Sequence, residues 1–199
     1  MAANRRFQLS WARDGALLVA REPADGEVEL HASGLCAWYN DEYNRRMMAN
    51  SVPIDELAVI ELYREMRERS GRPFLLFRDG DLVGDGDFRR IEGSRGEFAI
   101  TVGPRVAQGQ GLGTAFSVLL HTFAFQHLQL REVYLTIVAA NLPGRRCYEK
   151  VGYRVDDGPV ARAYADDEGD VAMVLTREAF LALHGRALEG IVITELPSG

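Results

Sequence analysis

The strongest constraint on the fold of this sequence is a strand that passes through a glycine-rich turn into a long, almost wholly apolar helix. Apolar residues alternate from Phe98 to Val102, as in a half-buried strand. Glycines follow at positions 109, 111 and 113, and apolar residues then recur at helical spacing from about Gly111 to His127. Because this helix is apolar on nearly every side, we expect it to be buried in the core, with the glycine turn at its N-terminus.

The elements around this unit predict a mixed sheet. Val133–Ala140 is nearly all apolar, which is typical of a central strand covered on both faces. Upstream, Pro73–Phe77 and Asp81–Ile91 flank Asp79-Gly80, a pair that favours a tight hairpin turn. Together these strands predict an α+β fold with a mixed, mostly antiparallel sheet flanked by helices. The other expected elements are strands at Ala16–Arg21, Tyr153–Val155 and Val171–Leu175, and helices at Gly26–Asn50, about Ile54–Met66 and Leu142–Val151.

The composition excludes several classes of protein. With 23 basic and 29 acidic residues among 199, the chain lacks the basic footprint of a nucleic-acid-binding protein. No apolar run approaches the ~20 residues of a membrane helix, and Met1 to Trp11 lack the apolar core of a secretion signal. We therefore expect a cytoplasmic protein without membrane contact. Cys36 and Cys147 form neither a disulfide framework nor a CxxC pair, and the four histidines lack metal-ligand spacing, so we expect no metal.

The glycine turn predicts an anion site. Glycines at alternate positions leave backbone N–H groups unshielded, and a helix N-terminus adds partial positive charge. Together they suit a phosphate or a pyrophosphate. The turn lacks the lysine of a P-loop, and Gly109, Gly111 and Gly113 give GxGxG rather than the GxGxxG of a dinucleotide-binding fold, although Glu132 stands near the position of that fold's acidic residue. A nucleotide-binding module remains an alternative.

Two segments resemble the GNAT N-acetyltransferases. The first segment, Gln108-Gly109-Gln110-Gly111-Leu112-Gly113, is similar to the family's Q/R-x-x-G-x-G/A pattern. In the second segment, Asn141 matches the family's Asn, and the run from Tyr148 to Tyr153 matches its Tyr-x-K-x-Gly-Phe/Tyr ending. Gly144 occupies the usual alanine position and Pro143 lies in the first turn of the helix. The resemblance covers about residues 73–175 of a single predicted domain, 1–199, with a strand and two helices in 1–72 and a C-terminal segment in 176–199. It implies six to seven strands, splayed between the fourth and the fifth.

The resemblance also implies site residues for acetyl-CoA as co-substrate. The family holds the coenzyme's pyrophosphate at the glycine turn, polarises the thioester with strand amides and contacts the pantetheine arm from the Asn. The matching residues here are Ile100, Thr101, Val102, Gln108, Gly109, Gln110, Gly111, Leu112, Gly113, Thr114, Asn141 and Arg146.

For catalysis, the resemblance implies Tyr148 as the acid that protonates the departing thiolate, and Glu97 as the base, with Asp85, Asp87 and Asp41 as alternative bases. The expected reaction is direct attack of a primary amine on acetyl-CoA in a ternary complex. The amine belongs to a peptide N-terminus, a polyamine or another small molecule.

Four further expectations concern the acceptor branch, the acceptor pocket, a homodimer and an alternative function. Trp38-Tyr39-Asn40-Asp41 resembles the opening helix of the branch that acetylates ribosomal-protein N-termini and polyamines. The acceptor pocket is expected from residues 36–55 and 156–170, and the tail Gly190–Leu196 is a candidate strand for a homodimer interface. The alternative function is a non-catalytic sensor that binds acyl-CoA and regulates a partner.

Overall fold

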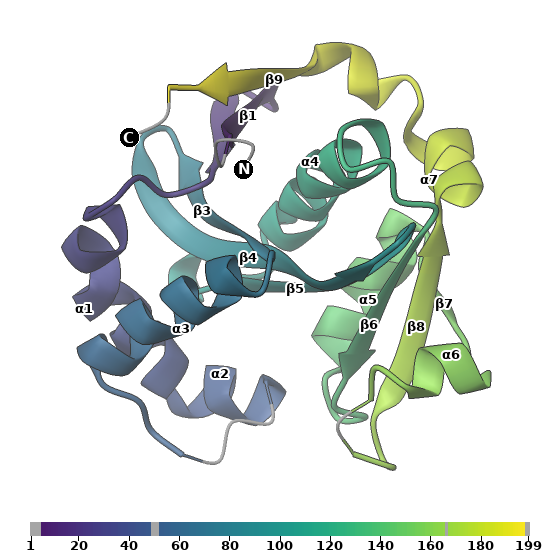
Figure 1. Cartoon of the computed structure of the whole chain (residues 1–199), viewed down its shortest axis with the longest axis horizontal. Coiled ribbons are helices and arrows are strands. Elements are labelled where there is room, and N and C mark those ends of the chain that lie inside the picture. Colours follow the sequence, from purple (N-terminus) through teal and green to yellow (C-terminus); the bar gives the residue numbers. More distant parts are fainter. Residues whose placement is uncertain (1–4, 49–51, 166, 198–199) are drawn as a thin grey trace.

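One mixed sheet runs through the computed structural model, which describes residues 5–48, 52–165 and 167–197. Its strand order in the described residues is β7-β8-β6-β5-β4-β3-β2-β1-β9, and every neighbouring pair is antiparallel except β5 and β6 (Figure 1). The mixed, mostly antiparallel sheet is therefore confirmed. The strands are β1 Arg6–Arg13, β2 Ala16–Arg21, β3 Arg72–Arg78, β4 Asp81–Glu92, β5 Arg95–Val102, β6 Glu132–Ile137, β7 Arg154–Val155, β8 Val171–Thr176 and β9 Ile191–Leu196.

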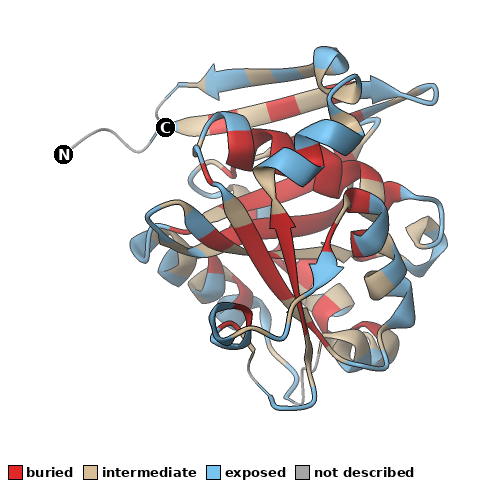
Figure 2. Ribbon diagram, turned by 90° about the vertical axis from the view of Figure 1, so that its right-hand side faces the viewer, coloured by how far each residue is buried: buried red, intermediate tan, exposed pale blue. Residues whose placement is uncertain are grey.

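Helices cover both faces of this sheet. Alternate residues of β3 point to opposite sides: Phe74 and Leu76 pack in the larger core with α4, whereas Leu75 and Phe77 pack against α1 and α3. The buried residues in Figure 2 accordingly gather in the central strands and the helix beside them. The helices are α1 Glu27–Asn40, α2 Glu42–Met47, α3 Glu56–Glu68, α4 Leu112–Gln126, α5 Leu142–Val151, α6 Pro159–Arg162 and α7 Arg177–His184.

The helix α4 is the centre of the core, as its sequence predicts. Phe116, Leu119 and Phe123 are fully buried. His121 is also fully buried: its Nδ1 donates to the carbonyl of Ser117 at 2.7 Å and its Nε2 accepts from the hydroxyl of Tyr153 at 2.6 Å. Burial lowers the pKa of His121 to about 3, so the ring stays neutral. It is therefore a hydrogen-bonded core residue.

The sheet opens between β5 and β6. Only residues Arg95–Glu97 of β5 pair with Glu132–Tyr134 of β6. Beyond these pairs, β6 stays paired with β8 and diverges from β5. The remainder of β5, from Phe98 to Val102, keeps β4 as its only strand partner among the described residues. The predicted splay is present, but it falls one strand later in the chain because β1 precedes it.

The N-terminal region corrects the sequence-based prediction. Instead of one helix over Gly26–Asn50, α1 ends at Asn40, and Asp41 adopts an extended conformation (φ −55°, ψ 129°) from which its carboxylate caps α2. Local hydrogen bonding of this Asp competes with helix continuation. Asn50 and Ser51, at the end of the predicted helix and the start of the next segment, lie outside the described residues.

The strand count was also too low, since the sheet has nine described strands rather than six or seven. β1 was missed although Phe7, Leu9 and Trp11 alternate and are buried. The tail forms β9, which pairs with β1 of the same chain over Ile191–Leu196. The helices α6 and α7 were not predicted, and β6 ends at Ile137 rather than at Ala140.

Two glycines give a matched test of this packing. A Cβ on Gly84 would lie 2.1 Å from the carbonyl oxygen of Thr101 on the paired strand, whereas a Cβ on Gly34 in α1 would meet nothing within 4 Å. We expect Gly84→Ala to lower the free energy of unfolding by about 1–3 kcal/mol and Gly34→Ala to raise it by about 0.5–1 kcal/mol. Urea unfolding of both variants checks this, and equal effects would contradict the close approach of β4 and β5.

Candidate active site

The glycine turn has the geometry of an anion site. Gly109 (φ 76°) and Gly111 (φ 81°) are both left-handed, and Gly111 caps α4 without a side chain. A Cβ on either would meet nothing within 4 Å, so the space beside their amides is open. Amides turned outward at alternate left-handed residues, next to a helix N-terminus, favour a phosphate group. We call residues 109–113 the glycine nest.

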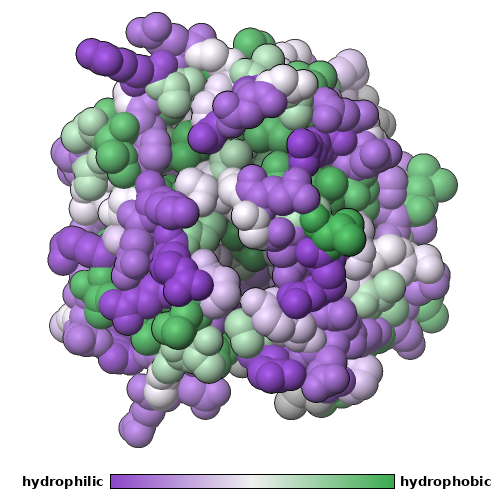
Figure 3. Space-filling model, turned by 180° about the vertical axis from the view of Figure 1, so that it is seen from behind, coloured by the Kyte–Doolittle hydropathy of each residue, from purple (hydrophilic) through white to green (hydrophobic). Residues whose placement is uncertain are grey.

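A cavity of about 1050 Å³ joins this nest to the opposite side of the splayed sheet. The face away from the viewer of Figure 1 is hollowed near its middle (Figure 3). Twelve of the fourteen predicted site residues line the cavity, and all twelve belong to the nest, β5 and α5 or their flanks. They are Glu97, Ile100, Thr101, Val102, Gln108, Gly109, Gly111, Gly113, Thr114, Asn141, Arg146 and Tyr148.

Two predicted residues do not line the cavity. The side chain of Gln110 turns away, donating to the carbonyl of Val106 at 2.6 Å and accepting from Arg78 at 2.9 Å. Leu112 is buried in the core. Only their backbone groups remain available to a ligand of the nest.

Gln108 holds the nest in place. Its side-chain amide donates to Oδ1 of Asn44 at 2.9 Å and to the carbonyl of Val102 at 2.8 Å. Asn44, which is buried, in turn donates to the carbonyls of Trp38 at 3.1 Å and Gly103 at 3.2 Å. Asn44 was not predicted from the sequence, because nothing in the local pattern of a helix indicates that one of its Asn residues contacts a residue 64 positions away.

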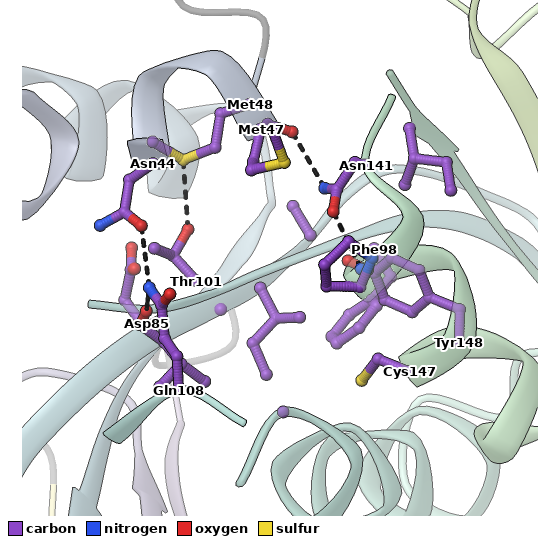
Figure 4. A pocket seen from close by; sticks show the side chains of 18 of the residues that line it. Asn44, Met47, Met48, Asp85, Phe98, Thr101, Gln108, Asn141, Cys147 and Tyr148 are labelled. Atoms are coloured by element: carbon purple, nitrogen blue, oxygen red, sulfur yellow. Dashed lines mark hydrogen bonds between the residues drawn. The ribbon is translucent and has the colours of Figure 1, made fainter. Parts of the chain in front are cut away.

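Asn141 joins α5 to α2. Its Oδ1 accepts from the amide of Gly144 at 2.9 Å, which confirms it as a helix cap, and its Nδ2 donates to the carbonyl of Met47 at 3.1 Å (Figure 4). A Cβ on Gly144 would lie 2.7 Å from that Oδ1, which accounts for glycine where the resemblance leads one to expect alanine.

Tyr148 lies beside Phe98 on the α5 wall of the cavity, with ring centroids 6.4 Å apart (Figure 4). Only 8% of the residue is exposed, and its hydroxyl makes no hydrogen bond to the described residues. Burial raises the pKa of Tyr148, so the phenol keeps its proton and can donate it. Burial likewise raises the pKa of the neighbouring Cys147 thiol, which disfavours a cysteine nucleophile.

Carboxylates line the cavity on the side of α2 and α3. Glu97 lies where β5 and β6 part, with its Oε2 3.5 Å from Nη1 of Arg90. Asp87 makes a bidentate ion pair with Arg89, at 2.6 and 2.7 Å. Asp41, the third alternative base, caps α2 and does not line the cavity. We call the part of the cavity between these carboxylates and the helices α2 and α3 the acidic chamber.

Asp85 is the most unusual of these carboxylates. The hydroxyls of Tyr39 and Tyr63 both donate to its Oδ2, the latter at 3.0 Å. Its Oδ1 is buried and accepts no hydrogen bond from the described residues. Burial raises its pKa to about 6. The sequence could not reveal this cluster, since its members come from α1, α3 and β4.

Within the described ranges, no group of three or more His, Cys, Asp or Glu residues could hold a metal ion. No helix in those ranges is long and apolar enough to cross a membrane.

A sheet splayed beside a glycine nest, with a protonated tyrosine and a carboxylate across the gap, defines an acyltransferase fold. Residues 25–154 match the model of the acetyltransferase (GNAT) domain. The chain therefore belongs to the GNAT family of acetyltransferases, which confirms the predicted family, fold class and type of enzyme. No curated protein sequence matches the chain.

Solved structures share the fold at low sequence identity. RimJ of Mycobacterium smegmatis in complex with CoA-disulfide has a TM-score of 0.68 at 15% identity, covering 96% of this chain and 97% of its own. The aminoglycoside acetyltransferase AAC(6')-Ib in complex with coenzyme A has a TM-score of 0.67 at 18% identity, and the match covers 83% of this chain and 98% of that one. Spermidine N-acetyltransferase of Vibrio cholerae in complex with CoA and spermine has a TM-score of 0.66 at 18% identity, and the match covers 82% of this chain and 98% of that one.

The raised pKa of Asp85 predicts an unusual pH dependence of stability. Its folded-state pKa of about 6, against an ordinary 3.8, means that the folded protein binds this proton more tightly than the unfolded chain. The contribution of this proton to the free energy of unfolding is therefore greatest below pH ~4. As the pH rises through ~6, that contribution, about 3 kcal/mol, is lost. We expect Asp85→Asn to remove this loss, so that its stability relative to the wild type increases between pH 4 and 7. Urea unfolding across that range checks it, and parallel profiles would contradict it.

Proposed function

We propose that this protein is a cytoplasmic enzyme of a single domain that transfers the acetyl group of acetyl-CoA to a primary amine. The observation that carries the proposal is the single cavity that joins the glycine nest to the acidic chamber through the splayed sheet. An anionic coenzyme and a cationic acceptor can thus approach the same gap from opposite sides. Of the three solved neighbours described above, two are named as acetyltransferases of amines, an aminoglycoside and spermidine, and the third is a complex with CoA-disulfide.

The coenzyme would bind along the nest and the free part of β5. Outward amides of Gly109–Gly113 suit its diphosphate. Backbone groups that β6 leaves without a strand partner from Ile100 to Val102, apart from the Val102 carbonyl bound by Gln108, can hydrogen-bond the pantetheine arm and polarise the thioester carbonyl. Thr114, Asn141 and Arg146 line the same wall and complete the coenzyme site.

The reaction removes two protons from the nitrogen and supplies one to the sulfur. An alkylammonium has no lone pair, so Glu97, at the point where the strands part, would accept the first proton from it, directly or through water. The amine nitrogen then bonds to the carbonyl carbon, the carbon–sulfur bond breaks, and the nitrogen gives up its second proton to water or back to the Tyr148 oxygen. Tyr148 would give its proton to the departing thiolate, a role that its high pKa and unpaired hydroxyl support. Proximity of the two substrates supplies much of the remaining rate.

A screen of thiol release tests the activity. With acetyl-CoA, we expect release that depends on an added amine, from a panel of a peptide with a free N-terminus, spermidine, kanamycin and hexylamine. Coenzyme A should raise the thermal midpoint more than ATP or NAD, because ligands of the folded state stabilise it. Coenzyme binding without transfer to any amine would favour the regulatory sensor, and preference for ATP or NAD would favour a nucleotide-binding module.

Tyr148→Phe separates chemistry from binding. We expect kcat to fall by about 10²–10⁴-fold, because the thiolate loses its acid, while the dissociation constant of acetyl-CoA changes little. Tyr164→Phe is the matched control, since Tyr164 is equally buried but stacks on Tyr134 away from the cavity. Stopped assays and calorimetric titration provide the two readouts. An unchanged kcat in Tyr148→Phe would remove this residue from the mechanism.

A further inference from the structure

The walls of the acidic chamber are apolar. Ala58, Leu62 and Met66, four residues apart on α3, all face the cavity, and Leu62 keeps 41% of its surface exposed there. Met47 and Met48 at the end of α2, together with Ile54, extend this surface. Methionine-rich surfaces adapt to flexible aliphatic chains. The chamber therefore suits an apolar stem rather than a polar, hydrated ligand.

The charges of the chamber leave one carboxylate without a cation. Asp87 is neutralised by Arg89, and Glu97 is paired with Arg90. Asp85 forms no ion pair with the described residues and meets only the phenols of Tyr39 and Tyr63. Asp170, a further carboxylate of the cavity lining, precedes β8 on the far side of the splay and is not one of these three. Within the acidic chamber, one carboxylate without an ion pair matches one positive charge, and a second ammonium there would lose its water against the apolar walls without gaining a partner.

Asp85 lowers the stability of the folded protein unless a ligand donates a hydrogen bond to its carboxylate. The residue is 8% exposed, and its Oδ1 is buried without a hydrogen bond from the described residues. An unsatisfied buried oxygen disfavours folding, whereas a cationic N–H donor from a ligand would satisfy it. Its position is also suitable: Asp85 pairs with Thr101, within the part of β5 that the splay leaves free.

We propose that the acceptor is a monocationic primary amine on an apolar stem, whose ammonium is bound by Asp85 and whose stem lies against Leu62 and its neighbours on α2 and α3. This inference rests on the proposed N-acetyltransferase function. Asp85 positions the ammonium beside the free edge of β5, and Glu97, four residues along β5 from the register partner of Asp85, takes its proton through water. The two carboxylates therefore affect different kinetic constants.

Amines of equal length test the charge. We expect kcat/KM for hexylamine to exceed that for 1,6-diaminohexane by at least ~10-fold, with spermidine and kanamycin poorer still, since each adds cations that the chamber does not match. Release of coenzyme A thiol with each amine gives these constants. A preference for the diamine, spermidine or kanamycin would overturn the inference while leaving the N-acetyltransferase function intact.

Variants test the two halves of the site. We expect Asp85→Asn to raise KM for hexylamine by ~10-fold or more with a smaller change in kcat, and Glu97→Gln to lower kcat instead. Asp81→Asn, on an exposed residue at the start of β4, is the control. Asp85→Asn with unchanged KM would refute the assignment, and the unfolding profiles described above show whether the variant is folded.

The stem contact has a gain-of-function test. Leu62→Glu adds a second carboxylate to the chamber, so we expect it to shift the preference from hexylamine towards 1,6-diaminohexane. Leu57→Glu, on the same helix but outside the cavity, should not. If Leu62→Glu and Leu57→Glu behave alike, the stem does not lie against α3. Failure of the wild type to acetylate any amine would instead refute the proposed function.

Discussion

The divergence of β5 and β6 is the constraint on which the rest of the site depends. Three residue pairs hold the two parallel strands together, after which β6 follows β8. Backbone groups of a central strand, normally used by a neighbour, are thereby left for a ligand. The helix α4, buried on almost all sides, packs in the same hydrophobic core as Phe98 of β5 and Val133 of β6 and supports the opening from one face. The core is thus what keeps the gap open.

The helix α2 connects the two halves of the cavity. Asn44 binds Gln108 at the root of the glycine nest, and the carbonyl of Met47 accepts from Asn141 on the opposite wall. A short helix that lines the acidic chamber is therefore hydrogen-bonded to both sides of the cavity. Its own start depends on Asp41, which interrupts what is otherwise a continuous helical pattern. The break between α1 and α2 thus allows α2 to start where it can form these hydrogen bonds.

Burial raises the pKa of both Tyr148 and Asp85, two ionisable groups of the cavity, because it disfavours their charged forms. Tyr148 keeps its proton because the cavity wall excludes water from most of its surface. Asp85 keeps a carboxyl group among two phenols, where a neutral side chain would be more stable. Structures tolerate such groups chiefly where a ligand or a reaction uses them. The cost in stability and the proposed role in binding are two aspects of one arrangement.

Periodicity and glycine spacing by themselves determined the buried helix α4, the hairpin at Asp79-Gly80, the helix α5 and the left-handed nest, because each depends on neighbours in the chain. The break at Asp41 and the strand β1 were missed although they too have local patterns. The strand in the tail was predicted, but its pairing with β1 of the same chain was not. Only the tertiary structure decided that Asp85 meets Tyr39 and Tyr63. That cluster unites three separate elements, and its pKa arises from burial, a property that no single segment possesses.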